Sequence, residues 1–334
     1  NKAGTLTSGT GNNGTWDFQI DYTLIGATPA PGDRFEYYIV AQDQASNPVN
    51  PNIGFNTEYY NNVATHTNNS VLLQAAAMPT PLNYDIVTPL GVSTVYVGSG
   101  VGTPNYPSFN GAGGLFELLN SSVLSSNLTV IVQNNVTEPA GAPTILNKIT
   151  DCGNNYRVTV RPASATNYTV TGNISGPGML SFNNVSLFTI DGSFGGSGSY
   201  LTFNNTNGTS AVAYYSNNSQ NDTIRNCNLQ ANNTAISSGI IHLGSSLTAG
   251  GGNSNMLFDN NNIGGSGLSA NGILSSGSAS ALNQNNDITN NRIFNFGSAA
   301  NGSGIMVDAV GNGSNWTISG NSVYNAVNSA ANGQ

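Results

Sequence analysis

A short pattern of apolar and polar residues recurs four times in the C-terminal part of the chain. Each copy reads apolar, any residue, Asn or Gly, Asn or Cys, any residue, apolar. The copies are IRNCNL from Ile224, FDNNNI from Phe258, ITNNRI from Ile288 and ISGNSV from Ile318, with starts 34, 30 and 30 residues apart. A repeat of about 30 residues predicts a solenoid in which each repeat forms one turn.

The two apolar residues of this pattern lie five positions apart, so a straight strand would point them to opposite faces. The chain must therefore turn a corner between them. Asn and Gly suit such a corner because they tolerate the left-handed backbone conformation. If each repeat makes one circuit, the corner residues stack about 4.8 Å apart and their amides can hydrogen-bond along the axis as a ladder. The predicted ladder contains Cys227, Asn261, Asn291 and Asn321.

A second apolar column supports the same repeat. Each of its members follows Ala or Gly, and the steps between them are 28, 33 and 32 residues: Val212, Ile240, Ile273 and Ile305. Three strands per circuit and about 30 residues per turn fit a parallel β-helix better than a propeller or a sandwich. The consensus of a leucine-rich repeat is absent.

The N-terminal part of the chain has a different pattern. Apolar and polar residues alternate over 16–22, which predicts a half-buried strand, and a second strand is expected over 35–42. Two or three strands are too few to bury a sandwich core. The run GDRFEYYIVAQDQASN over 32–47 resembles the closing strands of immunoglobulin-like or fibronectin type III-like modules, so residues 1–67 are interpreted as the C-terminal part of such a β domain. Residues 68–90, with one apolar run at 71–78, are expected to form a linker.

The segment GGLFELLNSSVL places apolar residues at helical spacing, which predicts a short helix near residues 113–124. A helix before the first turn would cover the open end of the solenoid core. The expected fold is all-β: the partial β domain, then a parallel β-helix with three-strand turns over residues 91–334. We expect this β-helix to begin with a capping helix and to continue beyond the sequence given.

Composition narrows the classes of function. Charged residues make up only 7% of the chain and the formal net charge is -8, so nucleic-acid binding is not expected. No apolar stretch is long enough to cross a membrane, and no signal sequence opens the chain. The excess of Asn, Thr, Ser and Gly suits an exported protein. Cys152 and Cys227 are too few for a disulfide framework, although they could pair with each other.

Several runs of sequence resemble a known family. TVYVGSG, NYPSFNGAGGLFELLN, NLTVIVQNNVTEP, YRVTVRPAS and GMLSFNNVSLFTIDGS, in this order, are similar to β-helix modules of large Bacteroidetes surface proteins. The resemblance covers residues 91 to about 324, and FTIDGS from Phe188 is its strongest match. It implies a right-handed parallel β-helix, a cell-surface or extracellular location, export by the type IX secretion system, and a gliding-type or adhesin-like role.

Parallel β-helices also include polysaccharide lyases and hydrolases, which need clustered carboxylates or an acidic calcium site beside a cation. The acids of the β-helix occur singly: Asp191, Asp222, Asp259, Asp287 and Asp308. Arg225 and Asp259 should be neighbours on adjacent turns, as a surface ion pair or, alternatively, a catalytic pair. Asp191 is expected to cap its turn rather than act as an acid. We favour no catalytic residues, with a polysaccharide-active enzyme as the alternative.

Other candidate chemistry is sparse. No second His or Cys stands at metal-ligand spacing from His242, so no metal or cofactor is expected. Cys227 is interpreted as a packed thiol rather than a nucleophile. Thr223 lies in Asp222-Thr223-Ile224, which is similar to the O-glycosylation signal of exported Bacteroidetes proteins and marks it as a candidate sugar attachment site.

Aromatic rings on a flat parallel face could stack on sugars. The candidates for glycan contact are Tyr214, Tyr215, Trp316 and Tyr324. Adjacent Tyr214 and Tyr215 must point to opposite faces, and packing in the core or at its rim is the alternative for each ring. The leading hypothesis is a non-enzymatic stalk or adhesin segment with surface glycans or other copies of itself as partners. A glycan-binding module is a further alternative.

Overall fold

The computed structural model describes residues 3–10, 13–26, 28–30, 33–37, 39–42, 51–55, 58–61, 81–245, 251–298, 302–308 and 310–327. The chain divides into two compact units between Thr88 and Pro89. Each unit is built from β-strands. The predicted apolar run at 71–78 and most of the predicted linker lie outside the described residues.

The first unit contains three small antiparallel sheets and one 3-10 turn, η1 (Tyr22–Ile25). The sheets pair β1 (Thr5–Thr10) with β2 (Asn13–Asp17), β3 (Arg34–Tyr37) with β7 (Leu82–Asp85), and β4 (Ile39–Gln42) with β5 (Pro51–Phe55) and β6 (Glu58–Asn61). This β segment is compatible with the expected partial β domain.

Two sequence predictions for this unit need correction. The strand predicted over 16–22 ends at Asp17, which pairs with Thr5, the first residue of β1. The chain then enters η1, whose N-cap Asp21 accepts a hydrogen bond from the Thr23 backbone N–H at 3.1 Å. The predicted linker also contributes β7, since Tyr84 packs against Phe35 with ring centroids 5.5 Å apart and bonds to the hydroxyl of Tyr22 at 2.8 Å.

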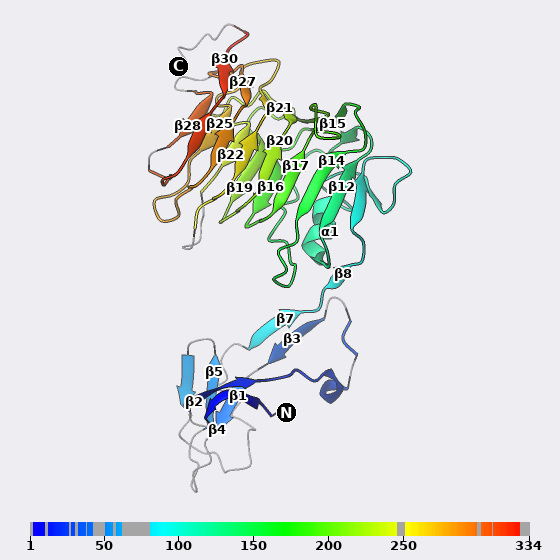
Figure 1. The fold of residues 1–334 in the computed structure, drawn as a ribbon, viewed down its shortest axis with the longest axis vertical. Coiled ribbons are helices and arrows are strands. Elements are labelled where there is room, and N and C mark those ends of the chain that lie inside the picture. The colour runs from blue at the N-terminus through cyan, green and yellow to red at the C-terminus, as the bar shows by residue number, and fades with distance from the viewer. Residues whose placement is uncertain are drawn as a thin grey trace. The chain divides into compact units, whose positions relative to one another are not determined.

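The second unit is a parallel β-solenoid of three sheets, whose strands lie side by side in Figure 1. The first sheet contains, in order, β10 (Asn105–Tyr106), β9 (Thr94–Val97), β12 (Leu128–Val132), β14 (Val158–Pro162), β17 (Phe188–Asp191), β20 (Thr223–Arg225), β23 (Leu257–Asp259), β26 (Asp287–Thr289) and β29 (Thr317–Ser319). The second contains β13 (Val136–Thr137), β15 (Tyr168–Gly172), β18 (Leu201–Asn205), β21 (Cys227–Ala231), β24 (Asn262–Ile263), β27 (Arg292–Phe294) and β30 (Ser322–Tyr324). The third contains β16 (Gly178–Asn183), β19 (Ala211–Ser216), β22 (Ile241–Leu243), β25 (Ile273–Ser275) and β28 (Ile305–Val307).

Each complete turn, or rung, takes one strand from each sheet, so three-strand turns are confirmed. The apolar column that opens the repeated pattern is also confirmed, since Ile224, Phe258, Ile288 and Ile318 are register partners on successive rungs. The first three of these side chains are fully buried. The hydrophobic core therefore runs along the axis inside the three sheets.

The second apolar column was predicted one residue out of register. Ile273 pairs with Ile241 rather than with Ile240, and Ile241 in turn pairs with Ala213 rather than with Val212. The sequence could not separate these alternatives because Ile240 and Ile241 are both apolar, and both are fully buried. The stacked column is Ala213, Ile241, Ile273 and Ile305.

The predicted helix is α1 (Leu115–Ser121), followed directly by β11 (Ser122–Leu124), which pairs with β8 (Thr88–Leu90). Its Leu115, Phe116 and Leu119 are buried in the solenoid core. Phe116 begins a line of rings that continues through Phe182 and Tyr215, with centroid separations of 5.9 Å and 4.8 Å. The helix thus covers apolar side chains of the first turns, as a cap must.

Candidate functional site

The corner of the repeated pattern carries a column of hydrogen-bonded side chains. The backbone N–H of Cys227 donates to Oδ1 of Asn261 at 3.0 Å. The backbone N–H and Nδ2 of Asn261 both donate to Oδ1 of Asn291 at 3.0 Å. The same two groups of Asn291 donate to Oδ1 of Asn321 at 2.9 Å and 3.1 Å. The structure therefore brings all four predicted ladder residues together, in four consecutive rungs.

Each asparagine of this ladder also bonds to the rung before it. The Nδ2 atoms of Asn261, Asn291 and Asn321 donate to the carbonyl oxygens of residues 224, 258 and 288 at 2.8 Å, 2.8 Å and 2.7 Å. Asn261 and Asn291 are almost fully buried. The amides thus satisfy backbone groups at the point where a corner interrupts the sheet hydrogen bonds, and such groups would otherwise be costly to bury.

The left-handed backbone expected at this corner is confirmed at the first residue of each corner pair, directly before the ladder residue. Asn226, Asn260, Asn290 and Gly320 have φ values of 55°, 52°, 55° and 67°. The rung before Asn226 does not turn so tightly, because residues 192–200 form a loop between β17 and β18. The ladder therefore has no amide to bond on that side, and Cys227 stands at its end.

Cys227 is a buried, free thiol whose Sγ donates to the Arg225 carbonyl at 3.1 Å. Burial raises the pKa of this thiol far above its usual range, with a further contribution from the charge of Asp191. A thiol with a raised pKa is a poor nucleophile. Cys152 is also free and is exposed, so the two cysteines are not paired.

A second buried ladder, which was not predicted from the sequence, lies at the corner between the third and first sheets. The Ser219 N–H donates to Oδ1 of Asn253 at 3.1 Å, and the N–H and Nδ2 of Asn253 donate to Oδ1 of Asn283 at 2.8 Å and 3.1 Å. Its residues are 34 and 30 positions apart, the same steps as in the predicted ladder. That spacing is the signal by which the sequence could have revealed it.

Asp191, the first of the candidate acids, is bound by its own turn and by the following rung. Asp191 forms an ion pair with Arg225 at 2.8 Å and accepts hydrogen bonds from the Ser193 N–H at 3.0 Å and from Nδ2 of Asn226 at 2.9 Å. Burial raises the pKa of Asp191, but these hydrogen bonds and the Arg225 charge outweigh burial and lower it. Asp191 is thus a turn cap held in its ionised form.

The expected ion pair between Arg225 and Asp259 needs correction. The two residues are register partners on adjacent rungs, but the guanidinium of Arg225 reaches back to Asp191 instead. Asp259 accepts hydrogen bonds from the Thr289 hydroxyl at 2.7 Å and from Nδ2 of Asn290 at 2.9 Å. Each carboxylate therefore bonds to polar groups of the following rung.

Of the five aspartates considered as candidate acids, Asp222 is the one that lies inside the core. Its Oδ1 accepts from the Phe188 N–H at 2.8 Å, while its Oδ2 is buried without a hydrogen-bond partner. Burial raises the pKa of this carboxyl well above its ordinary value, and the Phe188 N–H and Arg157 lower it only in part. Among the residues that the structure describes, no three His, Cys, Asp or Glu side chains come together as a metal site would require.

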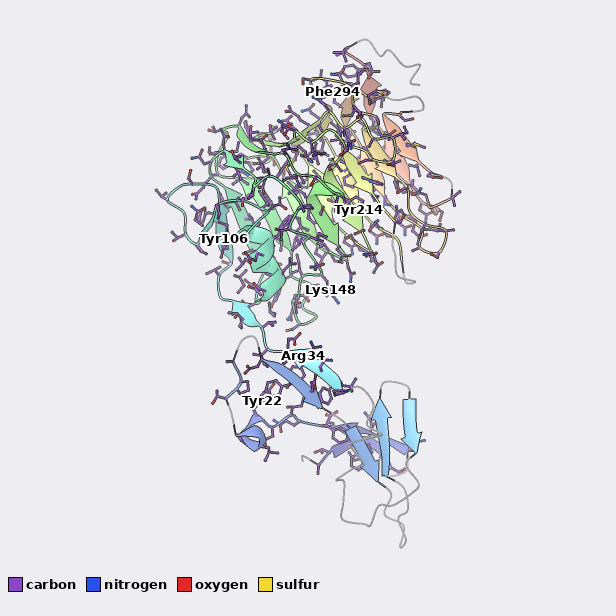
Figure 2. All side chains as sticks on the ribbon, turned by 180° about the vertical axis from the view of Figure 1, so that it is seen from behind. Tyr22, Arg34, Tyr106, Lys148, Tyr214 and Phe294 are labelled. Carbon is purple, nitrogen blue, oxygen red and sulfur yellow. The ribbon has the colours of Figure 1, made fainter. Side chains whose placement is uncertain are left out.

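His242 and Tyr214 form a small cluster on the third sheet, where Tyr214 is labelled in Figure 2. Their rings meet edge to face with centroids 5.1 Å apart, and Nε2 of His242 lies 3.0 Å from the Ser276 hydroxyl. Burial lowers the pKa of His242 from 6.5 to about 4. The imidazole is therefore neutral near pH 7, where it packs against Tyr214 and forms one hydrogen bond with Ser276.

The candidate glycan-contact residues separate into two groups. Tyr215 is 1% exposed and packs between Phe182 and Phe258, so its assignment as a glycan contact is wrong; strand alternation turns it into the core when Tyr214 faces out. Trp316 packs against the core, and its indole nitrogen is buried. Tyr214 and Tyr324 retain accessible ring surface.

Thr223, the candidate glycosylation site, lies on β20 between Thr189 and Leu257 of the adjacent rungs and is half-buried. Its neighbours Asp222 and Ile224 are buried. A glycosylating enzyme that recognises the side chains of Asp222, Thr223 and Ile224 together would therefore have to act before this strand folds into the solenoid.

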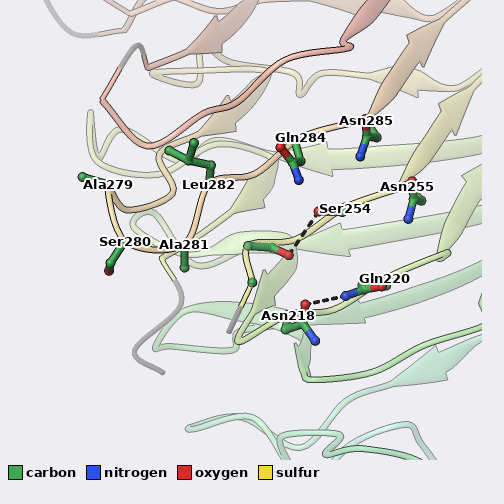
Figure 3. A pocket seen from close by; sticks show the side chains of 12 residues that line it. Asn218, Gln220, Ser254, Asn255, Ala279, Ser280, Ala281, Leu282, Gln284 and Asn285 are labelled. Atoms are coloured by element: carbon green, nitrogen blue, oxygen red, sulfur yellow. Dashed lines mark hydrogen bonds between the residues drawn. The ribbon is translucent and has the colours of Figure 1, made fainter. Parts of the chain in front are cut away.

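A groove of about 570 Å³ runs beside the second ladder (Figure 3). One wall is formed by side chains that repeat from rung to rung, in which Gln220, Ser254 and Gln284 are bridge partners. The opposite wall is the segment 279–282. None of the described lining residues carries a carboxylate or an aromatic ring. The groove can donate and accept hydrogen bonds, but it offers no acid, base or stacking platform.

Comparison of the chain with protein-family models, curated proteins and solved structures gives no match. Within the described part of the chain, no helix is long and apolar enough to cross a membrane. The function must therefore be argued from the geometry of the solenoid itself.

Proposed function

We propose that this chain is a non-enzymatic structural and adhesive segment of a large bacterial protein that acts outside the cell or on its surface. The observation that carries the proposal is the pair of buried amide ladders, which join rung to rung along the solenoid. The resemblance of residues 91 to about 324 to Bacteroidetes surface modules supports export by the type IX system and an adhesin-like or gliding-type role.

A rod of this construction resists bending and slipping. Adjacent rungs share backbone hydrogen bonds in three sheets and side-chain bonds at the corners, so sliding one rung past the next would break all of them together. The core also fixes the register, because a slip of one residue along a strand would turn buried side chains such as Phe258 and Ile288 to the outer face. Stiffness and defined length are what a stalk requires.

The polysaccharide lyase or hydrolase alternative receives less support from the same geometry. Asp191 and Asp259 already accept hydrogen bonds from neighbouring side chains, and Asp222 is buried in the core. Hydrolysis of glycosidic bonds uses two carboxyl groups about 5–10 Å apart on either side of an accessible bond. The groove beside the second ladder has no carboxylate among its described lining residues, so it offers no such pair.

Mechanical unfolding of the solenoid tests the proposal. Pulling single molecules along the axis should give high resistance that falls in a variant with Asn291→Ala, which removes the centre of the first ladder. Incubation of the same protein with neutral and acidic polysaccharides should release no reducing or unsaturated ends. Turnover of any polysaccharide that is abolished by changing an acid of the solenoid would refute the non-enzymatic role.

A further inference from the structure

The outer face of the second sheet carries two columns of polar and aromatic side chains. One column is Thr169, Thr202, Asn228, Asn262, Arg292 and Ser322. The other runs through Thr171, Asn204 and Gln230 and ends with Phe294 and Tyr324. Both columns are free of Asp and Glu. An anion can therefore approach this face without repulsion from a carboxylate of either column.

The second column is interrupted at Gly264. Ile263 pairs with Leu229 on one side and with Ile293 on the other, which places Gly264 between Gln230 and Phe294. A Cβ atom at Gly264 would lie 2.7 Å from two atoms of the Phe294 ring. Only glycine leaves room for the ring at this point, so the Phe294 ring lies over the place that a side chain at 264 would take.

A groove of about 470 Å³ lies beside this ring. Its lining includes Asn204, Gln230, Asn232, Gly264, Gly265 and Phe294. Phe294 is half-buried and is labelled in Figure 2. The groove thus has an aromatic ring at one end and amide side chains along its length, which is the mixture of stacking surface and few polar groups that small-ligand sites use.

Two of these amides are free to bind. The side chains of Asn204 and Gln230 form no hydrogen bond within the described residues, although they are neighbours on adjacent rungs. Other asparagines of the same face are bonded to one another, as when Nδ2 of Asn262 donates to Oδ1 of Asn228 at 2.9 Å. Asn204 and Gln230 therefore present unused donors and acceptors to the groove.

A cation stands beside the aromatic end. The Arg292 guanidinium lies 5.4 Å from the centroid of the Phe294 ring and 5.3 Å from that of Tyr324, and its Nε donates to the Tyr324 hydroxyl. The two rings are nearly parallel, with centroids 6.2 Å apart. Arg292 is exposed and has no carboxylate partner among the described residues. Its remaining donors are available for an anion.

We propose that this groove binds a saccharide chain that carries carboxylate groups, a partner that rests on the adhesive role proposed above. The apolar face of a sugar ring would stack on Phe294, its hydroxyl groups would bond to Asn204 and Gln230, and a carboxylate would pair with Arg292. A nucleic acid is disfavoured by the low charge of the chain. A protein partner would need a larger apolar anchor than one ring provides.

Calorimetric titration of the full chain with a uronic acid hexasaccharide, and with a neutral hexose hexasaccharide of the same linkage, tests this assignment. We expect binding of the acidic sugar to weaken about tenfold or more in Phe294→Ala and in Gln230→Ala. Arg292→Gln should weaken the acidic sugar and leave the weaker neutral binding unchanged. Gln284→Ala, a change to an amide in the other groove, is the matched control and should have no effect.

Gln230 is exposed and without side-chain partners among the described residues, so Gln230→Ala tests the site even if Phe294→Ala disturbs the fold. Failure of the unaltered chain to bind either sugar would overturn the saccharide assignment. An affinity for the acidic sugar that is unchanged in both Phe294→Ala and Gln230→Ala would overturn it as well. Equal affinity for the two sugars would overturn the role of Arg292. The mechanical and turnover experiments do not depend on sugar binding. A failure of the saccharide assignment can therefore be distinguished from a failure of the proposed structural role.

Discussion

Asp222 and Asn286 occupy the same position two rungs apart, and the asparagine alone has partners for both of its polar side-chain atoms. Oδ1 of each accepts a backbone N–H from the preceding rung, that of Phe188 for Asp222 and that of Met256 for Asn286. Nδ2 of Asn286 also donates to the Asn253 carbonyl at 3.1 Å, whereas Oδ2 of Asp222 has no partner. A carboxylate oxygen cannot donate, so the column favours an amide here.

The substitution Asp222→Asn should therefore stabilise the protein at neutral pH. The new Nδ2 would face the Val185 carbonyl, the counterpart of Asn253, and the gain should be about 1–3 kcal/mol. Because burial raises the pKa of Asp222 in the folded state, the unfolded chain releases this proton first as pH rises. The wild type should lose stability above the ordinary carboxyl pKa, and the variant should lose less. Urea unfolding near the ordinary carboxyl pKa, at about pH 4, and again near neutrality measures the difference.

Asp308→Asn is the control for this comparison, because Asp308 is exposed and, among the described residues, its Oδ1 accepts the Val310 N–H alone at 3.0 Å, which an amide oxygen can also accept. Its stability should change little at either pH. A destabilised Asp222→Asn protein at neutral pH would contradict the interpretation of the buried carboxyl.

The first ladder should be sensitive at its centre. Asn291→Ala removes the acceptor of the Asn261 N–H and the donor to the Phe258 carbonyl, both buried, and should cost about 2–5 kcal/mol. Asn291→Asp keeps the shape and the acceptor but places an oxygen against that carbonyl, so it should also destabilise. Asn262→Ala, which breaks one bond on the outer face, should cost under about 1 kcal/mol. Urea unfolding gives each loss, and equal losses for Asn291→Ala and Asn262→Ala would argue against the ladder as a source of stability.

His242 should titrate far below a free histidine. Its pKa is lowered by burial from 6.5 to about 4, so the unfolded chain gains a proton first as the pH falls. The stability that this residue contributes is complete above pH 6.5 and is lost as the pH falls toward 4. The imidazole NMR signal should move with a midpoint near the lower value, and a midpoint near 6.5 would show that the ring is not buried. In His242→Gln this part of the pH dependence should disappear.

The capping helix should contribute strongly through one ring. Phe116 is fully buried and contacts Phe109 and Phe182, so Phe116→Ala should cost about 3–5 kcal/mol. Glu117→Gln retains the acceptor for the Gly113 N–H on the exposed side of the helix and should change stability by less than about 0.5 kcal/mol. Thermal unfolding followed by circular dichroism distinguishes the two. Comparable melting temperatures for both variants would mean that α1 does not seal the core.

Much of the solenoid could be predicted because one short segment of each repeat contains both a core residue and the corner residues, and this segment recurs at regular steps. The short step from Ile224 to Cys227, repeated from Phe258 to Asn261, defined both an apolar column and a turn. The third sheet was harder, since Ile240 and Ile241 are chemically alike and only the backbone register separates them. The partner of Arg225 was also beyond sequence reasoning, because a strand neighbour exists on each side and geometry selects Asp191 over Asp259.

The groove beside Phe294 was not predicted; the candidate glycan contact Tyr324 packs against Phe294 but does not line the groove. The groove depends on a glycine at position 264, whose lack of a side chain matters only when Gln230 and Phe294 are known to lie on either side. The first unit was least predictable: apolar alternation indicated buried faces, yet Trp16, Phe18 and Ile20 are 43%, 43% and 40% exposed.

The equal 30-residue steps from Asn261 to Asn291 and from Asn291 to Asn321 have an evolutionary consequence. Excision of residues 262–291 would join Asn261 to Arg292 and recreate the sequence FDNNRI, a valid corner of the same type. Duplication of that segment would be equally conservative. Genes for such chains can therefore gain or lose length in whole units, so that selection can adjust how far the protein reaches without having to evolve a new junction.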